Sequence, residues 1–268
     1  MLNGLDLFSG IGGISLALSE WIRPVAYCEI DRYAQGVLLS RMSESMLPRA
    51  PVWDDIRTLR GSYLPPIDVI YGGFPCQDIS CAGAGAGLAG KRSGLFFEIM
   101  RLVSEIRPTF LFLENVPAIT SRGLAEVTAE ITKAGYDCRW ITLSAAEVGA
   151  NHKRDRWWLL AYSDSSRRNR QNLYVRSGEQ AETSDRSPWD SPNVLNSHGS
   201  SMEGQREQSS RALQKLSDTR LPGWWAVEPD VGRVVNGVPC RVDRIRGLGN
   251  AVVPLCAREA FKELMGLP

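Results

Sequence analysis

The first 162 residues predict an α/β fold built on a doubly wound sheet. Short apolar runs, typical of buried strands, alternate with segments of helical periodicity. The run at 110–113 is continuously apolar, as expected of a strand buried on both faces. Glycine or proline stands at several junctions between the runs. Strand and helix alternating in this rhythm are typical of a doubly wound sheet.

The boundaries of the elements follow from local signals. Asp31 is a good N-cap, Pro108 stops a helix before it, and Gly135 can close one. We expect strands at Gly4–Phe8, Pro24–Tyr27, Ile67–Tyr71, Phe110–Leu113, Arg139–Leu143 and Trp157–Ala161. We expect helices at Ile14–Trp21, from Asp31 to Met42, at Leu95–Ile106, Leu124–Ala134 and Leu255–Met265.

The composition changes abruptly after residue 162. Residues 163–222 contain 13 serines and few apolar side chains, so they cannot build much core of their own. A flexible linker and an insert that contacts a polar partner both fit this composition. The charges of the segment, 9 basic against 8 acidic, do not decide between them. Apolar sequence resumes at Trp224 and Trp225.

The bulk composition narrows the classes of function. The 31 basic and 30 acidic residues nearly cancel, so the whole chain is not a strongly basic nucleic-acid binder, although a local basic face remains compatible. No apolar run is long enough for a membrane helix and no secretory signal is recognisable, which predicts a soluble, cytoplasmic protein. The six scattered cysteines predict mostly free thiols, and the two histidines lie at no zinc-ligand spacing, so we expect no metal site.

A glycine-rich turn follows the first expected strand. The run at 6–13 reads Asp-Leu-Phe-Ser-Gly-Ile-Gly-Gly and leads into a helix, so a ligand can approach the backbone closely. Glu29 ends the second strand, where a carboxylate can accept hydrogen bonds from ribose hydroxyls. Together these features predict a cofactor that contains adenosine. NAD and S-adenosylmethionine both remain open.

A cysteine stands where chemistry is expected in an open α/β sheet. Cys76 follows the strand that ends at Gly72 and Gly73, and ligands in such folds lie at the carboxyl ends of strands. An arbitrary cysteine is more often a small buried hydrophobe, and we keep that interpretation for Cys81. The glycine and proline turn around Cys76 favours a nucleophile there.

Charged residues follow the next strands. Glu114 ends an apolar strand at the same edge as Cys76, and burial should raise its pKa so that it can hold a proton. A structural N-cap or an ion-pair partner is the alternative. Arg154 and Arg156 lie two apart on an extended segment and should face one side, where they could hold a base oxygen or a phosphate. A short basic run alone is more often a solvated edge.

These motifs together resemble the DNA (cytosine-5)-methyltransferases of the bacterial and phage type. The glycine run resembles the family's first motif, Gly-Phe-Pro-Cys-Gln its catalytic loop and Glu-Asn-Val at 114–116 its next motif. Asp-Asp-Ile at 54–56 resembles the acidic cofactor motif that follows the third strand, and the run at 246–254 resembles the last motif. They stand in the family's order and cover most of residues 1–162 and 230–268.

The resemblance implies a fold and a domain plan. The sheet would be the Rossmann-like sheet of class I S-adenosylmethionine-dependent methyltransferases, with a small, mostly irregular target-recognition insert. Residues 1–162 would form the catalytic and cofactor-binding domain and residues 163–229 the target-recognition region. Residues 230–268 would return to the catalytic domain.

The resemblance also implies roles for single residues. The catalytic set would be Cys76, Glu114, Arg154 and Arg156, the last three holding a flipped-out cytosine. S-adenosyl-L-methionine would be bound by Phe8, Gly10, Gly12, Glu29, Ile30, Asp55, Ile56, Asn250 and Val252. Contacts with substrate DNA would come from Pro75, Gln77, Ser80 and His152. His152 stands where the family usually has glutamine.

The implied reaction is methylation of carbon 5 of cytosine in double-stranded DNA. The Cys76 thiolate would add to carbon 6, which activates carbon 5 toward the methyl group. The base must leave the duplex first. The resemblance implies a monomer, with a cognate restriction endonuclease as a potential partner in the same system. Three other hypotheses stay open: a tRNA substrate, a non-catalytic DNA- or cofactor-binding module, and a nicotinamide oxidoreductase based on the glycines and Glu29.

Overall fold

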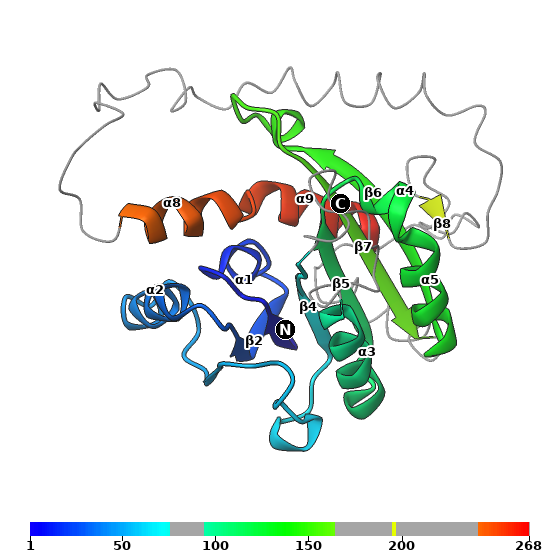
Figure 1. Cartoon of the computed structure of the whole chain (residues 1–268), viewed down its shortest axis with the longest axis horizontal. Coiled ribbons are helices and arrows are strands. Elements are labelled where there is room, and N and C mark those ends of the chain that lie inside the picture. Colours follow the sequence, from blue (N-terminus) through cyan, green and yellow to red (C-terminus); the bar gives the residue numbers. More distant parts are fainter. Residues whose placement is uncertain (76–93, 164–194, 197–240, 268) are drawn as a thin grey trace.

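The computed structural model describes residues 1–75, 94–163, 195–196 and 241–267. The described strands form one mixed sheet in the order β3-β2-β1-β4-β5-β7-β6-β8 (Figure 1). The predicted α/β fold is therefore confirmed. Cys76, Gln77, Ser80 and nearly all of the segment 163–229 lie outside the described residues.

The first five strands are parallel and carry the carboxyl edge where ligands are expected. They are β1 (Leu2–Leu7), β2 (Ile22–Cys28), β3 (Val52–Trp53), β4 (Val69–Gly73) and β5 (Phe110–Asn115). The strand order reverses between β1 and β4, because β2 lies on one side of β1 and β4 on the other. Open α/β sheets bind ligands at such a switch point.

The remaining strands are antiparallel. The hairpin of β6 (Tyr136–Ser144) and β7 (Asp155–Ser163) places β7 between β5 and β6, and the short β8 (Leu195–Asn196) pairs with β6. β7 runs opposite to β5, with Asn115 paired to Trp157 and Glu114 to Trp158. The beginning of β7 therefore lies beside the end of β5.

Helices cover both faces of the sheet (Figure 1). On one face α3 (Leu95–Ile106) and α5 (Leu124–Lys133) pack against Leu111 and Leu113 of β5 in one apolar cluster. On the other face α1 (Gly13–Ala17) and α9 (Pro254–Met265) pack against the alternate residues, Phe110 and Phe112. The smaller helical elements are α2 (Arg32–Ser43), α4 (Ile119–Arg122), α8 (Arg241–Asn250), and the 3-10 turns at Gly61–Tyr63 and Ala145–Val148.

Helix α9 brings the end of the chain back to the sheet. Its Phe261 ring meets Phe112 edge-on with centroids 5.2 Å apart, and Phe112 stacks on Trp158 at 5.3 Å. All three side chains are almost fully buried. Burial of a large aromatic side chain and an edge-to-face contact each stabilise the fold, so this cluster fixes α9 against β5 and β7.

The observed elements differ from the sequence-based expectations at particular residues. The first strand ends at Leu7, one residue early, because Phe8 has a left-handed backbone (φ 52°) that no strand continues. Helix α1 ends at Ala17 where Trp21 was expected, since β2 already begins at Ile22. Helix α3 has the predicted bounds, and Asp31 caps α2 by accepting from the Ala34 N–H. Among the described residues no helix is both long and apolar enough to cross a membrane.

Candidate active site

The glycine-rich turn after β1 leaves room beside its backbone. Phe8, Gly10 and Gly12 all have positive φ angles, of 52°, 53° and 81°. A side chain at Gly10 would meet nothing nearer than the Phe8 carbonyl oxygen at 4.0 Å, so the turn faces open space there. Gly12, in contrast, lies in a crowded place, because a Cβ there would lie 2.6 Å from the Leu47 side chain. One glycine therefore leaves space for a ligand and the other allows close packing.

Glu29 is locked to this turn through both carboxylate oxygens. Its Oε2 accepts from the Gly10 N–H at 2.7 Å and its Oε1 from the Asp31 N–H at 2.8 Å. The side chain is mostly buried, whereas the neighbouring Ile30 is 65% exposed. A carboxylate with spare lone pairs thus lies next to an uncovered apolar side chain, a combination suited to a ribose and a flat base.

The acidic residues after β3 are arranged differently. The Asp55 carboxylate pairs with the Arg57 guanidinium at 2.9 Å, and this hydrogen bond lowers the pKa of Asp55. The Ile56 side chain is buried in the core, and its carbonyl oxygen accepts from Arg101. A ligand can therefore reach only the backbone of Ile56 and the part of the Asp55 side chain that is turned away from Arg57.

The last motif returns to the glycine turn. Val252 stands so close to Gly13 that a Cβ there would lie 3.0 Å from the Val252 Cγ2. The preceding Asn250 is exposed. Two carbonyls beside it, those of Gly249 and Ala251, accept from the Arg154 Nη2 at 2.8 and 2.7 Å. Gly13 and Val252, which are 239 positions apart in the sequence, are thus adjacent.

A buried carboxyl group and an arginine pair at the end of β5. The Glu114 Oε1 lies 2.7 Å from the Arg156 Nε, with side-chain exposures of 13% and 20%. Gly73 of β4 makes space for this pair, because a Cβ there would lie 2.4 Å from the Glu114 Oε2. Burial raises the pKa of Glu114, while Arg156 and Arg154 act against the rise. The predicted rise is confirmed, and it favours a proton held at this carboxyl group.

The chain leading to Cys76 is anchored by a residue that the sequence analysis assigned no role. The buried Asn115 Nδ2 donates to the Phe74 carbonyl oxygen at 3.1 Å, and its Oδ1 accepts from the Val116 N–H at 2.8 Å. Pro75, the last described residue before Cys76, is half-buried. Asn115 therefore fixes where the cysteine loop leaves β4. Its position directly after Glu114 was the available signal.

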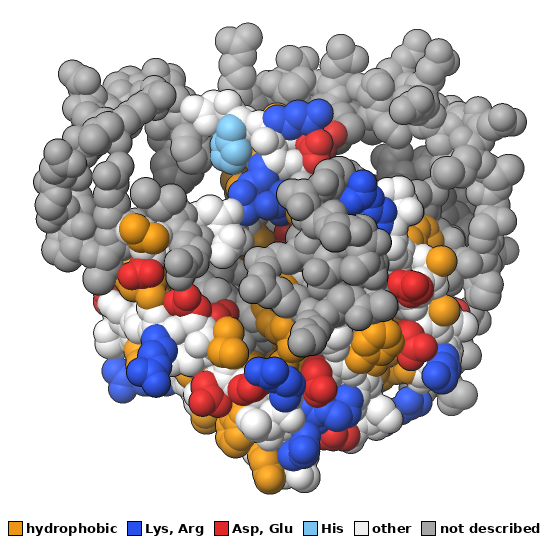
Figure 2. Space-filling view, viewed as in Figure 1, with side chains coloured by type: hydrophobic (Ala, Val, Ile, Leu, Met, Phe, Trp, Pro, Cys, Tyr) orange, Lys and Arg blue, Asp and Glu red, His pale blue; other side chains and the backbone are white. Residues whose placement is uncertain are grey.

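His152, one of the predicted DNA contacts, lies at an exposed edge, whereas Gln77 and Ser80 lie outside the described residues. His152 and Lys153 are exposed, and the Lys153 Nζ lies 3.5 Å from Asp155. In Figure 2 basic side chains and an acidic one lie near the coloured histidine at the upper edge, and acidic and basic side chains interleave over the lower part of the same face. Exposed basic side chains of this kind can contact a phosphate backbone.

A third largely buried carboxyl group, that of Asp6, lies under the glycine turn. Asp6 is 1% exposed, and its Oδ2 accepts from the Ser15 hydroxyl at 2.5 Å. The Ser15 oxygen also lies 2.7 Å from the Tyr71 hydroxyl, which joins β1, α1 and β4. Burial raises the pKa of Asp6 to about 7. Sequence analysis gave Asp6 no role, and its burial could not be inferred from the motif.

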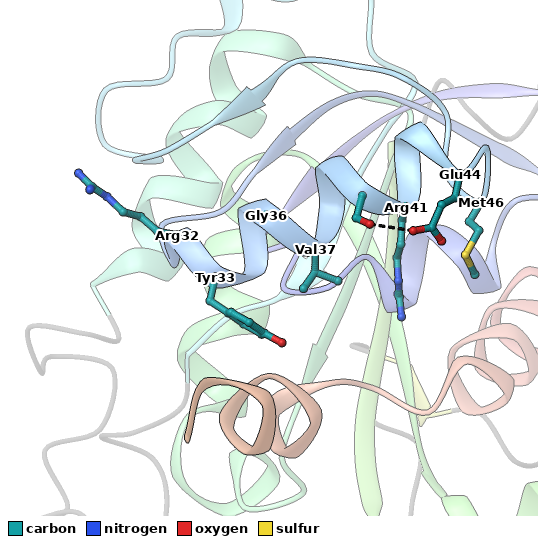
Figure 3. A pocket seen from close by; sticks show the side chains of 8 residues that line it. Arg32, Tyr33, Gly36, Val37, Arg41, Glu44 and Met46 are labelled. Carbon is teal, nitrogen blue, oxygen red and sulfur yellow. Dashed lines mark hydrogen bonds between the residues drawn. The ribbon is translucent and has the colours of Figure 1, made fainter. Parts of the chain in front are cut away.

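A cavity of about 550 Å³ runs along α2 on the side that faces α8 (Figure 3). Tyr33 points toward α8, and the Ser40 hydroxyl bonds to Glu44 at the other end of the cavity. Arg41, which lines it, donates to the Ile11 carbonyl oxygen of the glycine turn. None of the sequence-predicted site residues lines this cavity.

Known proteins resemble this chain in sequence. Type II methyltransferase M.CviJI of Paramecium bursaria Chlorella virus IL3A is 39% identical over 159 residues, which are 59% of this chain and 42% of that protein. Type II methyltransferase M.HhaI of Haemophilus parahaemolyticus is 32% identical over 166 residues, 60% of this chain and 49% of that protein. The matched part thus spans about half the length of these relatives.

Solved structures agree at the level of the fold. A proposed DNA modification methyltransferase encoded within an E. coli prophage superposes with a TM-score of 0.51 at 28% identity, over 62% of this chain and 48% of that one. Spodoptera frugiperda DNMT2 superposes with a TM-score of 0.51 at 20% identity, over 61% and 50%. The second likeness concerns the fold alone.

A family model decides the assignment. The model for C-5 cytosine-specific DNA methylases matches residues 2–222, well over half of the sequence. Three of the motifs quoted from the sequence lie, in the described part of the chain, directly after or at the end of β1, β3 and β5. The chain therefore belongs to the C-5 cytosine-specific DNA methylase family.

Proposed function

We propose that this chain transfers a methyl group from S-adenosyl-L-methionine to carbon 5 of a flipped-out cytosine in duplex DNA. The observation that carries the proposal is the Glu114–Arg156 pair, held at 2.7 Å over Gly73 at the end of β4. From that strand end the chain leads within three residues to Cys76. A protonatable carboxyl group, a guanidinium and a thiol close in the chain to one sheet edge are the groups that addition to a cytosine ring requires.

The cofactor site fits S-adenosylmethionine. The open space at Gly10 accommodates a ligand against the backbone, Glu29 offers hydrogen-bond acceptors for ribose hydroxyls, and Ile30 offers an apolar face for adenine. The proposal assigns to the same cofactor site the residues Phe8, Gly12, Asp55, Ile56 through its backbone, Asn250 and Val252. The cofactor supplies an electrophilic methyl group on a sulfonium. The glycine turn and Glu29 serve to hold that group beside the base.

The protein residues carry the remaining steps. The Cys76 thiolate adds to carbon 6 of the cytosine, and Glu114 donates its proton or a hydrogen bond to ring nitrogen 3 as charge develops there. Arg156 holds the Glu114 carboxyl group in place and can reach a base oxygen. Carbon 5 then takes the methyl group, a base removes the carbon-5 proton, and elimination releases Cys76 and restores the ring.

Duplex DNA is the proposed partner because the exposed basic edge at His152 and Lys153 adjoins the base site. Pro75, Gln77 and Ser80 would contact the target strand from the cysteine loop, and the segment 163–229 would choose the sequence. We further propose that the protein acts as a monomer. Because its relatives are named type II methyltransferases, the proposal includes a cognate restriction endonuclease as a partner in the same system.

The test is the transfer of labelled methyl from S-adenosylmethionine to duplex DNA, with tRNA as a parallel substrate. Wild-type protein should label DNA and the Cys76→Ser variant should not. Duplex DNA that contains 5-fluorocytosine should form a stable adduct with wild-type protein only, because fluorine blocks the elimination that frees Cys76. Labelling of tRNA alone, or equal labelling by the Cys76→Ser variant, would overturn the proposal.

A further inference from the structure

Arg154 and Arg156 look equivalent in sequence but contact different partners. The Arg156 guanidinium meets Glu114 and the adjacent Asp155 carbonyl oxygen. The Arg154 Nη2 instead donates to the carbonyl oxygens of Gly249 and Ala251, at 2.8 and 2.7 Å. These acceptors lie 95 and 97 residues further along the chain. Among the described residues, no hydrogen bond joins Arg154 to Glu114.

The two carbonyls belong to the end of a helix. Gly249 is in the last turn of α8 (Arg241–Asn250), and Ala251 is the first residue beyond it. The last carbonyls of a helix have no partner within it and carry the negative end of its dipole. A guanidinium that donates to both is a stabilising cap. Arg154 thus fixes where α8 stops.

The position at which α8 ends determines how residues 249–252 of the last motif pack against the glycine turn. The capped carbonyls flank Asn250, and the next residue, Val252, packs against Gly13. The Ala251 N–H also donates to the Gly247 carbonyl oxygen at 3.0 Å, which keeps the segment compact. The contacts therefore run without a break from the start of β7, through Arg154 and the segment 249–252, to the turn that would hold the cofactor.

We propose that Arg154 is a positioning residue of the cofactor site, holding the segment 249–252 against the glycine turn, and that it is not a contact to the target base. The inference rests on the proposed function, since it concerns the same cofactor. It separates the two arginines: Arg154 sets the affinity for S-adenosylmethionine before any DNA is bound, and Arg156 acts on the base through Glu114.

The experiment compares Arg154→Ala and Arg154→Lys with Arg156→Ala as the matched control. Calorimetry measures S-adenosylmethionine binding to each protein without DNA. We expect the Kd to rise about 10-fold for Arg154→Ala, because two charge-assisted hydrogen bonds are lost. Lysine can donate to both carbonyls, so Arg154→Lys should stay within about threefold of wild type. Arg156→Ala should also stay within about threefold.

A second measurement needs no cofactor. Amide hydrogen exchange of the unliganded proteins should be faster at residues 247–253 in Arg154→Ala and unchanged there in Arg156→Ala, since only Arg154 caps α8. Equal Kd values and equal exchange for Arg154→Ala and wild type would overturn the inference. A Kd that rises as much in Arg156→Ala as in Arg154→Ala would also overturn it.

The outcomes for this inference and for the proposed function are separable. If wild-type protein fails to bind S-adenosylmethionine, the proposed function fails while the exchange measurement still tests the cap. If Arg154→Ala does not fold, Arg154→Lys decides: retained binding together with retained protection of residues 247–253 supports the inference. An Arg154→Lys variant that folds but loses S-adenosylmethionine binding or the protection of residues 247–253 contradicts it.

Discussion

Glu29 and Glu114 are two carboxyl groups at the same edge of one sheet, and they are held in opposite ways. Glu29, on the β2 side of the switch point, accepts from two backbone N–H groups, those of Gly10 and Asp31. Glu114, on the β5 side, is paired with the Arg156 side chain. Both are largely buried. The partner, and not the degree of burial, distinguishes the two halves of the site.

The difference indicates two kinds of task. Backbone donors are neutral, local and fixed by the glycine turn, so Glu29 is oriented as a permanent acceptor. The partner of Glu114 comes from an antiparallel strand 42 positions away and is charged, while burial raises the pKa of Glu114. A carboxyl group under these opposing influences can exchange a proton. Under the proposed function, one half of the site binds the cofactor and the other half reacts with the base.

The largest effect is expected for Glu114→Gln. An amide keeps the size of the side chain but can neither transfer the proton nor pair with the Arg156 charge, so single-turnover methyl transfer should fall about 10³-fold. Affinity for S-adenosylmethionine without DNA should not change. If transfer falls by less than about tenfold, Glu114 is not the proton donor and the contrast with Glu29 disappears.

Asp6→Asn sharpens the comparison, because Asp6 is a buried carboxyl group on the binding side. Its pKa is raised from 3.8 to about 7 in the folded protein, so the folded state binds the proton more tightly than the unfolded chain. This stability is fully present below pH 4 and is lost as the pH rises toward 7. Between pH 5 and pH 7 wild type should lose roughly 2 to 3 kcal/mol relative to the variant.

Denaturant unfolding at several pH values measures this difference. The groups that face Asp6 are Glu29, whose charge favours the protonated form, and Tyr27, Tyr71 and Cys28. Burial raises the pKa of each of the last three, so they stay neutral throughout this window. Parallel pH profiles for wild type and variant would mean that Asp6 does not titrate there.

The smallest effect is expected for Glu29→Gln. The amide nitrogen must face one of the two N–H groups, so one hydrogen bond is lost and the ribose loses an acceptor. The Kd for S-adenosylmethionine should rise about 10-fold. The transfer rate at saturating cofactor should match wild type. A fall in that rate, with unchanged Kd, would assign Glu29 to the reacting half.

Most of the parallel half of the fold was predictable from local signals. Pro108, the Asp31 cap and the continuous apolar run at 110–113 marked their elements correctly. Helix α8 was missed because its two glycines and five charged or polar residues give no apolar periodicity. It is held by Arg154, a contact between residues 95 positions apart that no local pattern encodes. The antiparallel insertion of β7 beside β5 also depends on tertiary pairing.

The site could be predicted as a set of residues but not as a set of partners. The prediction put three charged residues at the correct edge of the sheet, namely Glu114, Arg154 and Arg156, because strand ends in an α/β sheet converge. That Arg156 meets Glu114 while Arg154 meets α8 depends on where each guanidinium finds an acceptor, which spacing does not specify. The use of Asn115 to anchor Phe74 was likewise visible only in three dimensions.

The contacts of Arg154 have a consequence for how this protein can vary. They join the start of β7 to the end of α8. The described fold therefore already sets the distance between Ser163, where β7 ends, and Arg241, where α8 begins. Doubling the length of a flexible loop between fixed ends costs only about 0.6 kcal/mol. Apart from β8, which pairs with β6, a change in the length of the intervening sequence should therefore cost the site little stability, provided that Arg154 keeps its two carbonyls. Under the proposed function, specificity would diversify in such a segment while the chemistry stays constant.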